Sequence, residues 1–296
     1  MHTILRSMSA LFFACGFWGL AGCSSTGSFD GAPANKTPRA DSGSPHGGTA
    51  FPAITDPTMN GSFPTNSPQG QAEGPDCEIH RPATLGENGF KHPPTMWGNG
   101  ITTTPAAYVG LLGTIASNGF VIVASNSTNV TAPLMTAGLD WLVAQNDVPG
   151  DFQGKLDPSC LVSIGYSLGG GASVNAGSHE NVVTTVSFHG LTGNSAALHG
   201  PLLLFTSTMD TFVSAAQFVT PTFDASTVQT FYATLSGTGD AGHYTPINTG
   251  GPERAPAIAW LRLWVYGDQA ARQYFDGADC ILCKDPWTNP QTKNWQ

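Results

Sequence analysis

Short apolar runs alternate along the chain with stretches in which apolar residues recur every three or four positions. The apolar runs predict strands that are buried on both faces of a sheet. They span residues 120–124, 161–164, 182–188, 201–205 and 228–235. The helical stripes lie around residues 108–115, 135–145 and 257–265. This alternation predicts an α/β fold with a mostly parallel sheet covered by helices on both faces.

The first residues follow a different pattern. Arg6 precedes an apolar run over 8–20, which is too short to span a bilayer but suits a signal peptide. The run ends in Leu20-Ala21-Gly22-Cys23, which resembles the lipobox of bacterial lipoproteins. We therefore expect residues 1–22 to be removed and Cys23 to be lipidated, which would anchor the protein to the bacterial cell envelope, at the outer membrane. An ordinary signal peptide cut nearby, giving a secreted protein, is the alternative.

Composition then divides the mature chain. Residues 23–73 are rich in Ser, Thr, Gly and Pro and poor in large apolar residues, so they predict a disordered tether. Residues 74–296 predict a single catalytic domain with a cysteine-containing C-terminal tail, which we expect to be a monomer. The chain carries 11 Lys and Arg against 20 Asp and Glu, so its net charge of -9 argues against nucleic acid as a partner. Membrane contact is expected only through Cys23.

The strongest chemical motif is G-x-S-x-G at residues 165–169, between a predicted strand and a small-residue helix. A nucleophilic serine needs such a sharp turn to expose its hydroxyl, and the following helix directs N–H groups and its dipole at a developing oxyanion. Ser167 is therefore the candidate nucleophile. A glycine-rich turn that only packs helix against strand is the alternative interpretation.

A serine hydroxyl is a weak nucleophile and needs a base and an orienting acid, which in this type of fold follow in the order Ser, Asp, His. Asp210 follows the strand over 201–205, and it could also cap the next helix. Of the eight histidines, only His243 follows Asp210, in a glycine-rich loop after a predicted strand. We assign Asp210 and His243 to the two roles, with an ordinary loop histidine as the alternative for His243.

The developing oxyanion needs two backbone donors. One comes from Leu168, directly after the nucleophile, and the other from Ile101 in the glycine-rich segment 98–101, unless that segment is a plain turn. Gly100 and Tyr166 flank these groups and are candidate substrate contacts. The chemistry requires no metal and no organic cofactor.

Four cysteines fall in the predicted domain: Cys77, Cys160, Cys280 and Cys283. An even number suits an oxidising compartment, and four cysteines allow three pairings. We favour a bond between Cys280 and Cys283, with a zinc pair as the alternative.

With these residues assigned, the segment 77–264 resembles the bacterial polyester hydrolases, the cutinase and PET hydrolase family. The resemblance rests on Trp97-Gly98-Asn99-Gly100-Ile101, on the Ser167 elbow, on Asp210-Thr211 and on Gly242-His243. It implies an α/β-hydrolase fold without a lid domain. His189 stands where these enzymes usually place a cleft-lining tryptophan, so it is a candidate substrate contact, and stacking on aromatic rings is expected to be altered.

These observations predict a serine carboxylic ester hydrolase with an acyl-enzyme mechanism, acting on small, bulky or polymeric esters. A lipase, a thioesterase or a serine peptidase could use the same three residues. A surface lipoprotein that only binds ligands on a hydrolase scaffold is an alternative from a different class.

Overall fold

The computed structural model describes residues 56–65, 75–237 and 239–295. The predicted signal segment, the lipobox at Cys23 and most of the predicted tether therefore lie outside the described residues. Within those ranges, no helix combines the length and the apolar character that crossing a membrane would require.

Eight strands form one sheet, in the spatial order β1-β3-β2-β4-β5-β6-β7-β8. Their bounds are β1 (Cys77–His80), β2 (Pro94–Gly98), β3 (Val121–Ser125), β4 (Leu161–Tyr166), β5 (Val182–Phe188), β6 (Leu202–Ser207), β7 (Thr230–Leu235) and β8 (Trp287–Lys293). Every pairing from β3 to β7 is parallel, whereas β1 and β8 pair antiparallel at the two edges. The mostly parallel sheet predicted from the apolar runs is confirmed.

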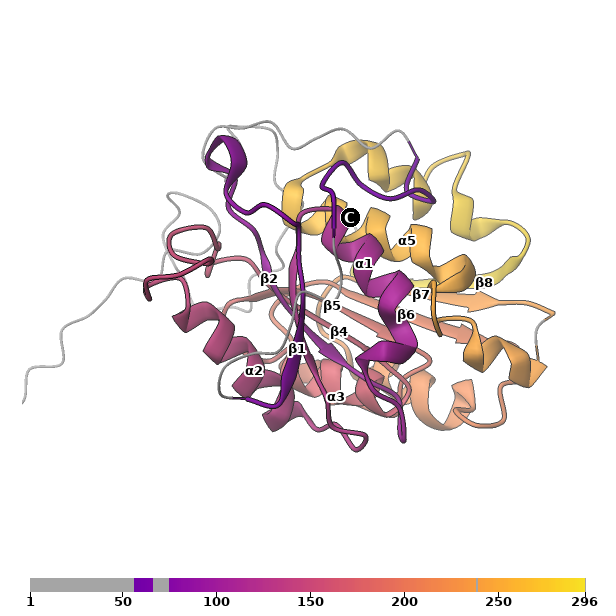
Figure 1. Ribbon diagram of the computed structural model, residues 1–296. Helices are drawn as coiled ribbons and strands as arrows, with labels where there is room; N and C mark the ends of the chain where they lie inside the picture. Colours follow the sequence, from indigo (N-terminus) through magenta and orange to yellow (C-terminus); the bar gives the residue numbers. More distant parts are fainter. Residues whose placement is uncertain (1–55, 66–74, 238, 296) are drawn as a thin grey trace, which may run out of the picture.

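Helices cover both faces of this sheet (Figure 1). They are α1 (Val109–Ser117), α2 (Ala132–Ala144), α3 (Leu168–Ala176), α4 (Thr220–Ala225) and α5 (Arg254–Leu261), which continues as a π-helical turn at Arg262–Tyr266. One hydrophobic cluster packs α1 and α5 against the sheet, and a second packs α2 and part of α3 on the other side. Because both faces are buried, the parallel strands need apolar side chains at nearly every position, which explains their continuous runs.

The two edge strands and the inner strand β2 were not predicted. β1 is only four residues long, and β8 contains Pro290 and the left-handed Asn289, with a φ of 46°. Neither strand has a clear apolar run, because each is paired on one side only. Proline is tolerated there because an edge strand need not donate every N–H.

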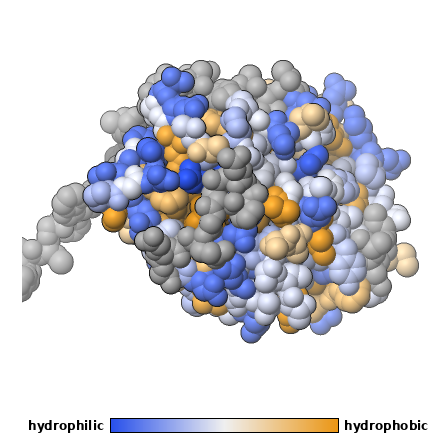
Figure 2. All heavy atoms as spheres, viewed as in Figure 1, coloured by the Kyte–Doolittle hydropathy of each residue, from blue (hydrophilic) through white to orange (hydrophobic). Residues whose placement is uncertain are grey.

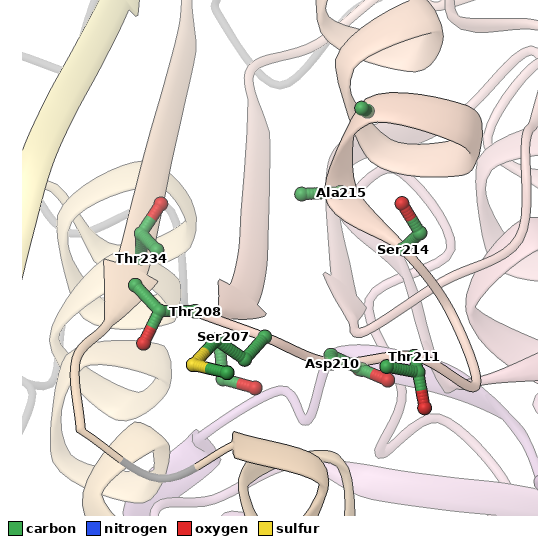
Figure 3. A pocket seen from close by; sticks show the side chains of 9 residues that line it. Ser207, Thr208, Asp210, Thr211, Ser214, Ala215 and Thr234 are labelled. Carbon is green, nitrogen blue, oxygen red and sulfur yellow. The ribbon is translucent and has the colours of Figure 1, made fainter.

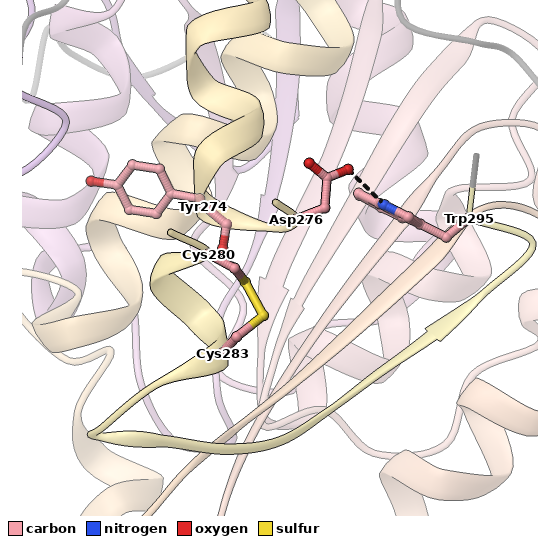
Figure 4. The surroundings of a disulfide bond; sticks show 5 residues. All are labelled: Tyr274, Asp276, Cys280, Cys283 and Trp295. Carbon is pink, nitrogen blue, oxygen red and sulfur yellow. Dashed lines mark hydrogen bonds between the residues drawn. A yellow bond between two sulfur atoms is a disulfide. The ribbon is translucent and has the colours of Figure 1, made fainter. Parts of the chain in front are cut away.

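The C-terminal tail belongs to the hydrophobic core. Trp295 stacks against Trp260 with ring centroids 5.9 Å apart. Its indole donates a hydrogen bond to Asp276 over 3.0 Å (Figure 4). The predicted bond between Cys280 and Cys283 is present nearby. Cys77, on the opposite edge strand, is a free and buried thiol. The tail therefore secures the β8 edge.

Part of the predicted tether contacts the domain. The N–H groups of Gly61 and Phe63 donate to the side chain and the carbonyl of Ser117, over 2.8 and 3.0 Å. The ring of Phe63 lies 5.2 Å from that of Phe90. Residues 56–65 therefore belong with the folded domain, because one aromatic side chain gives an otherwise polar segment an apolar contact.

Candidate active site

Two neighbouring parallel strands, β4 and β5, end at the same level of the sheet, and β6 beside them runs on to Ser207. In their register, Tyr166 at the end of β4 lies opposite Phe188 of β5, and Phe188 lies opposite Phe205 of β6. Ser167 and His189 are the residues that directly follow β4 and β5. The parallel register thus brings two residues singled out from the sequence to one edge of the sheet.

Each of these strand ends turns sharply through a residue in the left-handed region. The φ values are 56° for Ser167, 47° for His189 and 62° for Met209, which follows β6 and precedes Asp210. Non-glycine residues rarely adopt this conformation, and such strain is concentrated at functional sites. The three turns redirect the chain out of the sheet, so that side chains gather at its carboxyl edge.

Ser167 sits in a strand–helix elbow. Its N–H donates to the carbonyl of Phe188 over 2.9 Å, and α3 begins at the next residue. The serine is 8% exposed. The backbone around it is tightly packed, since a Cβ on Gly165 would lie 2.0 Å from the carbonyl oxygen of Gly169.

Asp210 and His243 meet in a short contact. The ring Nδ1 of His243 lies 2.8 Å from Oδ2 of Asp210, so this nitrogen carries the hydrogen and donates it. The other oxygen of Asp210 accepts the N–H groups of Phe212 and Val213, over 3.0 and 2.9 Å. The histidine and the two backbone N–H groups thus bind different oxygens of one carboxylate. The predicted role of Asp210 as a helix N-cap is wrong, because the next helical segment begins at Ala215 and these N–H groups lie in a bend before it.

Burial opposes ionisation of Asp210. The His189 ring at 3.4 Å and the hydrogen bonds from His243 and the backbone of Val213 outweigh that effect and hold the pKa of the carboxyl below its usual value. The side chain is therefore an anion across the pH range in which most proteins are folded.

The loop that carries His243 reaches the end of β4. It forms a 3-10 turn over Gly239–Tyr244, directly beyond β7. The ring of Tyr166, the residue before Ser167, lies 5.2 Å from the His243 ring. Among the described residues, however, Ser167 and His243 share no hydrogen bond. Such catalytic contacts are often loose without substrate and tighten when it binds.

His189 does not face solvent. Its side chain is 0% exposed, with Nδ1 at 3.4 Å from Asp210 and Nε2 at 3.0 Å from Oε1 of Glu253. Glu253, at the end of the short 3-10 helix Gly251–Glu253 that leads into α5, is likewise 0% exposed. Burial acts to lower the pKa of His189, but the two carboxylates outweigh it and raise the pKa above its ordinary value.

The segment 98–101 lies directly against the elbow. The N–H of Gly169 donates to the carbonyl of Asn99 over 3.0 Å, and the buried side chain of Asn99 accepts the indole N–H of Trp97 over 2.9 Å. Within the described part of the chain, the N–H groups of Ile101 and Leu168 have no acceptor. Both predicted oxyanion donors are therefore available in segments that touch each other.

The expected substrate contacts are all buried. Gly100, Tyr166 and His189 lie beneath the surface, and His189 is turned inward because two carboxylates hold its ring. The exposed apolar side chains around the site come instead from neighbouring positions: Ile101, Met209, Phe212 and Tyr244. We call these four residues the apolar rim. Ile101 was predicted from the sequence as an oxyanion donor. Met209, Phe212 and Tyr244 were not predicted, although Met209 adjoins Asp210 and Tyr244 adjoins His243.

The apolar rim includes two aromatic side chains that contact the imidazole of His243. On the face seen in Figure 2, hydrophobic residues are scattered among polar ones. At the rim, the Phe212 ring stacks on His243 at 5.6 Å and meets the Tyr244 ring edge-on at 5.5 Å. Two aromatic side chains from different loops therefore flank the same imidazole.

A depression of about 590 Å³ lies beside Asp210, lined by residues 207–211, 214–216 and Thr234. Figure 3 shows it where the chain leaves β6, with Thr234 of β7 on one side and Ser214 and Ala215 on the other. Ser167 and His243 are not among its lining residues. It adjoins the site without covering the serine.

His189, Asp210 and His243 also have the composition of a metal site, since one donor atom from each lies within 4.8 Å of the others. In the structure, however, the same Asp210 oxygen is paired with both imidazoles, so ordinary hydrogen bonding and ion pairing account for the cluster.

An open, mostly parallel sheet with helices on both faces and a serine in a strand–helix elbow defines the class of α/β-hydrolases. The family model described as "PET hydrolase-like" matches residues 100–288, well over half of the chain, and the chain belongs to this family.

Its curated relatives include several cutinases. Cutinase 2 of Thermobifida cellulosilytica is 26% identical over 200 residues, which cover 63% of this chain and 71% of the relative. Cutinase cut1 of Thermobifida fusca is also 26% identical over 200 residues, covering 63% of this chain and 58% of the relative. Cutinase est2 of Thermobifida alba is 27% identical over 202 residues, covering 64% and 63%. The match spans less than two thirds of the length of the last two.

The tight packing of the elbow generates a prediction. Gly165→Ala should lower the free energy of unfolding by about 3 kcal/mol, because the new methyl group would overlap the backbone of Gly169. The matched control is Gly237→Ala, whose Cβ would meet no heavy atom within 4 Å. The control should lose only about 1 kcal/mol to left-handed backbone strain. Chemical denaturation measures both, and equal losses would show that elbow packing is not the cause.

Proposed function

We propose that this protein is a serine hydrolase of carboxylic esters that works through an acyl-enzyme intermediate. Ser167 is the nucleophile, His243 the general base and Asp210 the residue that orients the imidazole. The observation that supports this most directly is the 2.8 Å contact between His243 Nδ1 and Asp210 Oδ2, at the sheet edge that carries Ser167. Membership of the PET hydrolase-like family and the likeness to cutinases support an ester as the substrate.

In the first half-reaction, Oγ of Ser167 attacks the ester carbonyl carbon while Nε2 of His243 takes the hydroxyl proton. The carbonyl electrons move to the oxygen, which becomes an oxyanion, and the N–H groups of Ile101 and Leu168 donate to it. Asp210 stabilises the imidazolium that forms, because its carboxylate already accepts the Nδ1 hydrogen.

The tetrahedral intermediate then collapses and the alcohol leaves with the proton held by His243. A water molecule attacks the acyl-enzyme, again giving its proton to His243, and the second collapse releases the carboxylic acid and restores Ser167. Every step uses side chains and backbone N–H groups of this chain.

The apolar rim supports bulky or polymeric esters as substrates. Met209 is 81% exposed, Ile101 60% and Phe212 56%, so the described chain leaves the surroundings of the site open. An open apolar surface can bind part of a long substrate whose ends extend beyond the enzyme. We propose that the rim, instead of the buried Gly100, Tyr166 and His189, makes most of the substrate contacts.

The sequence also supports a place of action outside the cell. We propose that residues 1–22 direct export and that Cys23 anchors a monomeric enzyme by lipid, with release as the alternative. Residues 74–296, with the packed segment 56–65, would then act as one catalytic domain beyond the anchor.

The proposed nucleophile leads to a direct test. Ser167→Ala should reduce hydrolysis of a p-nitrophenyl ester by a factor of about 10⁴ to 10⁶, as loss of a nucleophilic serine does in other hydrolases. It should also abolish covalent labelling by a serine-directed phosphonate. Ser178→Ala, near the end of α3 and away from the elbow, is the matched control and should keep both properties. A wild-type protein that is folded but unlabelled would instead support the binding scaffold.

The apolar rim leads to a second test. Phe212→Ala should lower the rate on an insoluble aliphatic polyester film by about tenfold, which corresponds to ~1.4 kcal/mol of lost binding. Hydrolysis of p-nitrophenyl acetate should change by less than about threefold, because that ester is too small to span the rim. Val148→Ala, another exposed apolar residue, should change neither rate. Equal losses on both substrates in Phe212→Ala would argue against the rim as a polymer surface.

A further inference from the structure

A second histidine and a second carboxylate lie behind the proposed triad. His189 touches Asp210 on one side and Glu253 on the other, and all three side chains are 0% exposed. The His189 ring also meets the His243 ring edge-on at 5.7 Å. The order of contacts is therefore Glu253, His189, Asp210, His243, across four segments of the chain. The mechanism above uses only the last two.

With both carboxylates ionised, these contacts favour the charged form of His189. An ionised carboxylate only accepts hydrogen bonds, whereas a neutral imidazole has one N–H and one lone pair. With a carboxylate beside each ring nitrogen, a neutral His189 would direct a lone pair at an anion in a buried place. The imidazolium carries a hydrogen on both nitrogens and also neutralises one of the two buried negative charges.

Glu253 is in turn tied to the loop that bears His243. The hydroxyl of Thr245, two residues beyond His243, donates to Oε1 of Glu253 and lies 2.8 Å from the carbonyl oxygen of Gly242. Two tyrosines also lie beside His243: Tyr166, whose pKa is raised by burial, so that its hydroxyl stays neutral, and Tyr244, whose ring meets the imidazole edge-on at 5.5 Å. The charges that face His189 are therefore those of Asp210 and Glu253.

We propose that His189 is a positioning residue of this enzyme: its imidazolium, anchored by Glu253, holds Asp210 in place and sets the charge that His243 experiences. This proposal rests on the serine mechanism proposed above. With His189 charged, the buried group of Asp210, His189 and Glu253 carries one net negative charge. Without that cation it would carry two, and protonation of His243 would become easier.

The direction of the pH effect follows. In His189→Gln, His243 should bind a proton at higher pH, and a protonated imidazole cannot accept the serine hydrogen. The acid limb of the pH profile should therefore move upward by about one pH unit, so that the rate below the midpoint falls about tenfold. In the double variant His189→Gln, Glu253→Gln, one negative charge remains as in the wild type, and the acid limb should return toward its original position.

The measurement is the second-order rate constant of phosphonate labelling against pH, together with the rate on p-nitrophenyl acetate. His179→Gln is the matched control, because His179 pairs with Asp140 over 3.1 Å at the surface. Its profile should match that of the wild type. A purely structural role for His189 predicts a lower rate in both His189 variants with no movement of the acid limb, and that result would overturn the proposal.

A second measurement does not depend on whether His189→Gln folds. In wild-type protein labelled with ¹⁵N-histidine, one ring should show both nitrogens protonated at a pH above ~6.5, the ordinary histidine value. Its signal should be missing from the double variant. A neutral ring in this position would contradict the proposal. If the wild type is not labelled by the phosphonate at all, the serine mechanism has failed, and the NMR result then stands as a finding about His189 alone.

Discussion

The parallel register of β4, β5 and β6 is the constraint on which the site depends. It aligns the ends of β4 and β5 and places the end of β6 just beyond them, and after each strand the chain turns sharply through a residue with positive φ. Ser167, His189 and Asp210 consequently reach the same edge although they are far apart in the sequence. A slip of one residue in any of these pairings would turn one of the side chains toward the opposite face of the sheet.

Two negatively charged carboxylates are also buried at that edge. Asp210 and Glu253 are both shielded from water, and two uncompensated carboxylates there would be costly. The structure meets this cost with backbone N–H groups at Asp210 and with the imidazole of His189 between the two acids. The same arrangement fixes the orientation of Asp210, so electrostatic compensation and the geometry of the proposed triad depend on each other.

Much of this arrangement was readable from the sequence. The continuous apolar runs gave the parallel strands because those strands are buried on both faces, and the order of Ser167, Asp210 and His243 gave three residues that the fold brings to one region. β1 and β8 were missed because edge strands need no such runs, and β2 was missed because its short sequence, Pro94 to Gly98, is not a continuous apolar run. Glu253 was missed because it lies in an unremarkable Gly-Pro-Glu turn, and only the folded chain shows that it faces His189.

The position of His189 shows that a residue's role cannot always be assigned from the matching position in a related family. The family resemblance placed it in the cleft, where a tryptophan would face the substrate. A histidine at the same position is short and polar, and nearby carboxylates draw it inward. The apolar surface at the site is supplied by Phe212 and Tyr244 instead, and these residues became visible only with the fold.

A crystal structure of the protein after reaction with a phosphonate would test the central claim most directly. The account requires phosphorus to be bonded to Oγ of Ser167, with the phosphoryl oxygen about 2.7–3.1 Å from the N–H groups of Ile101 and Leu168. Nε2 of His243 should face the remaining oxygen of the adduct. Phosphorus on another residue, or a phosphoryl oxygen directed away from both N–H groups, would contradict the account.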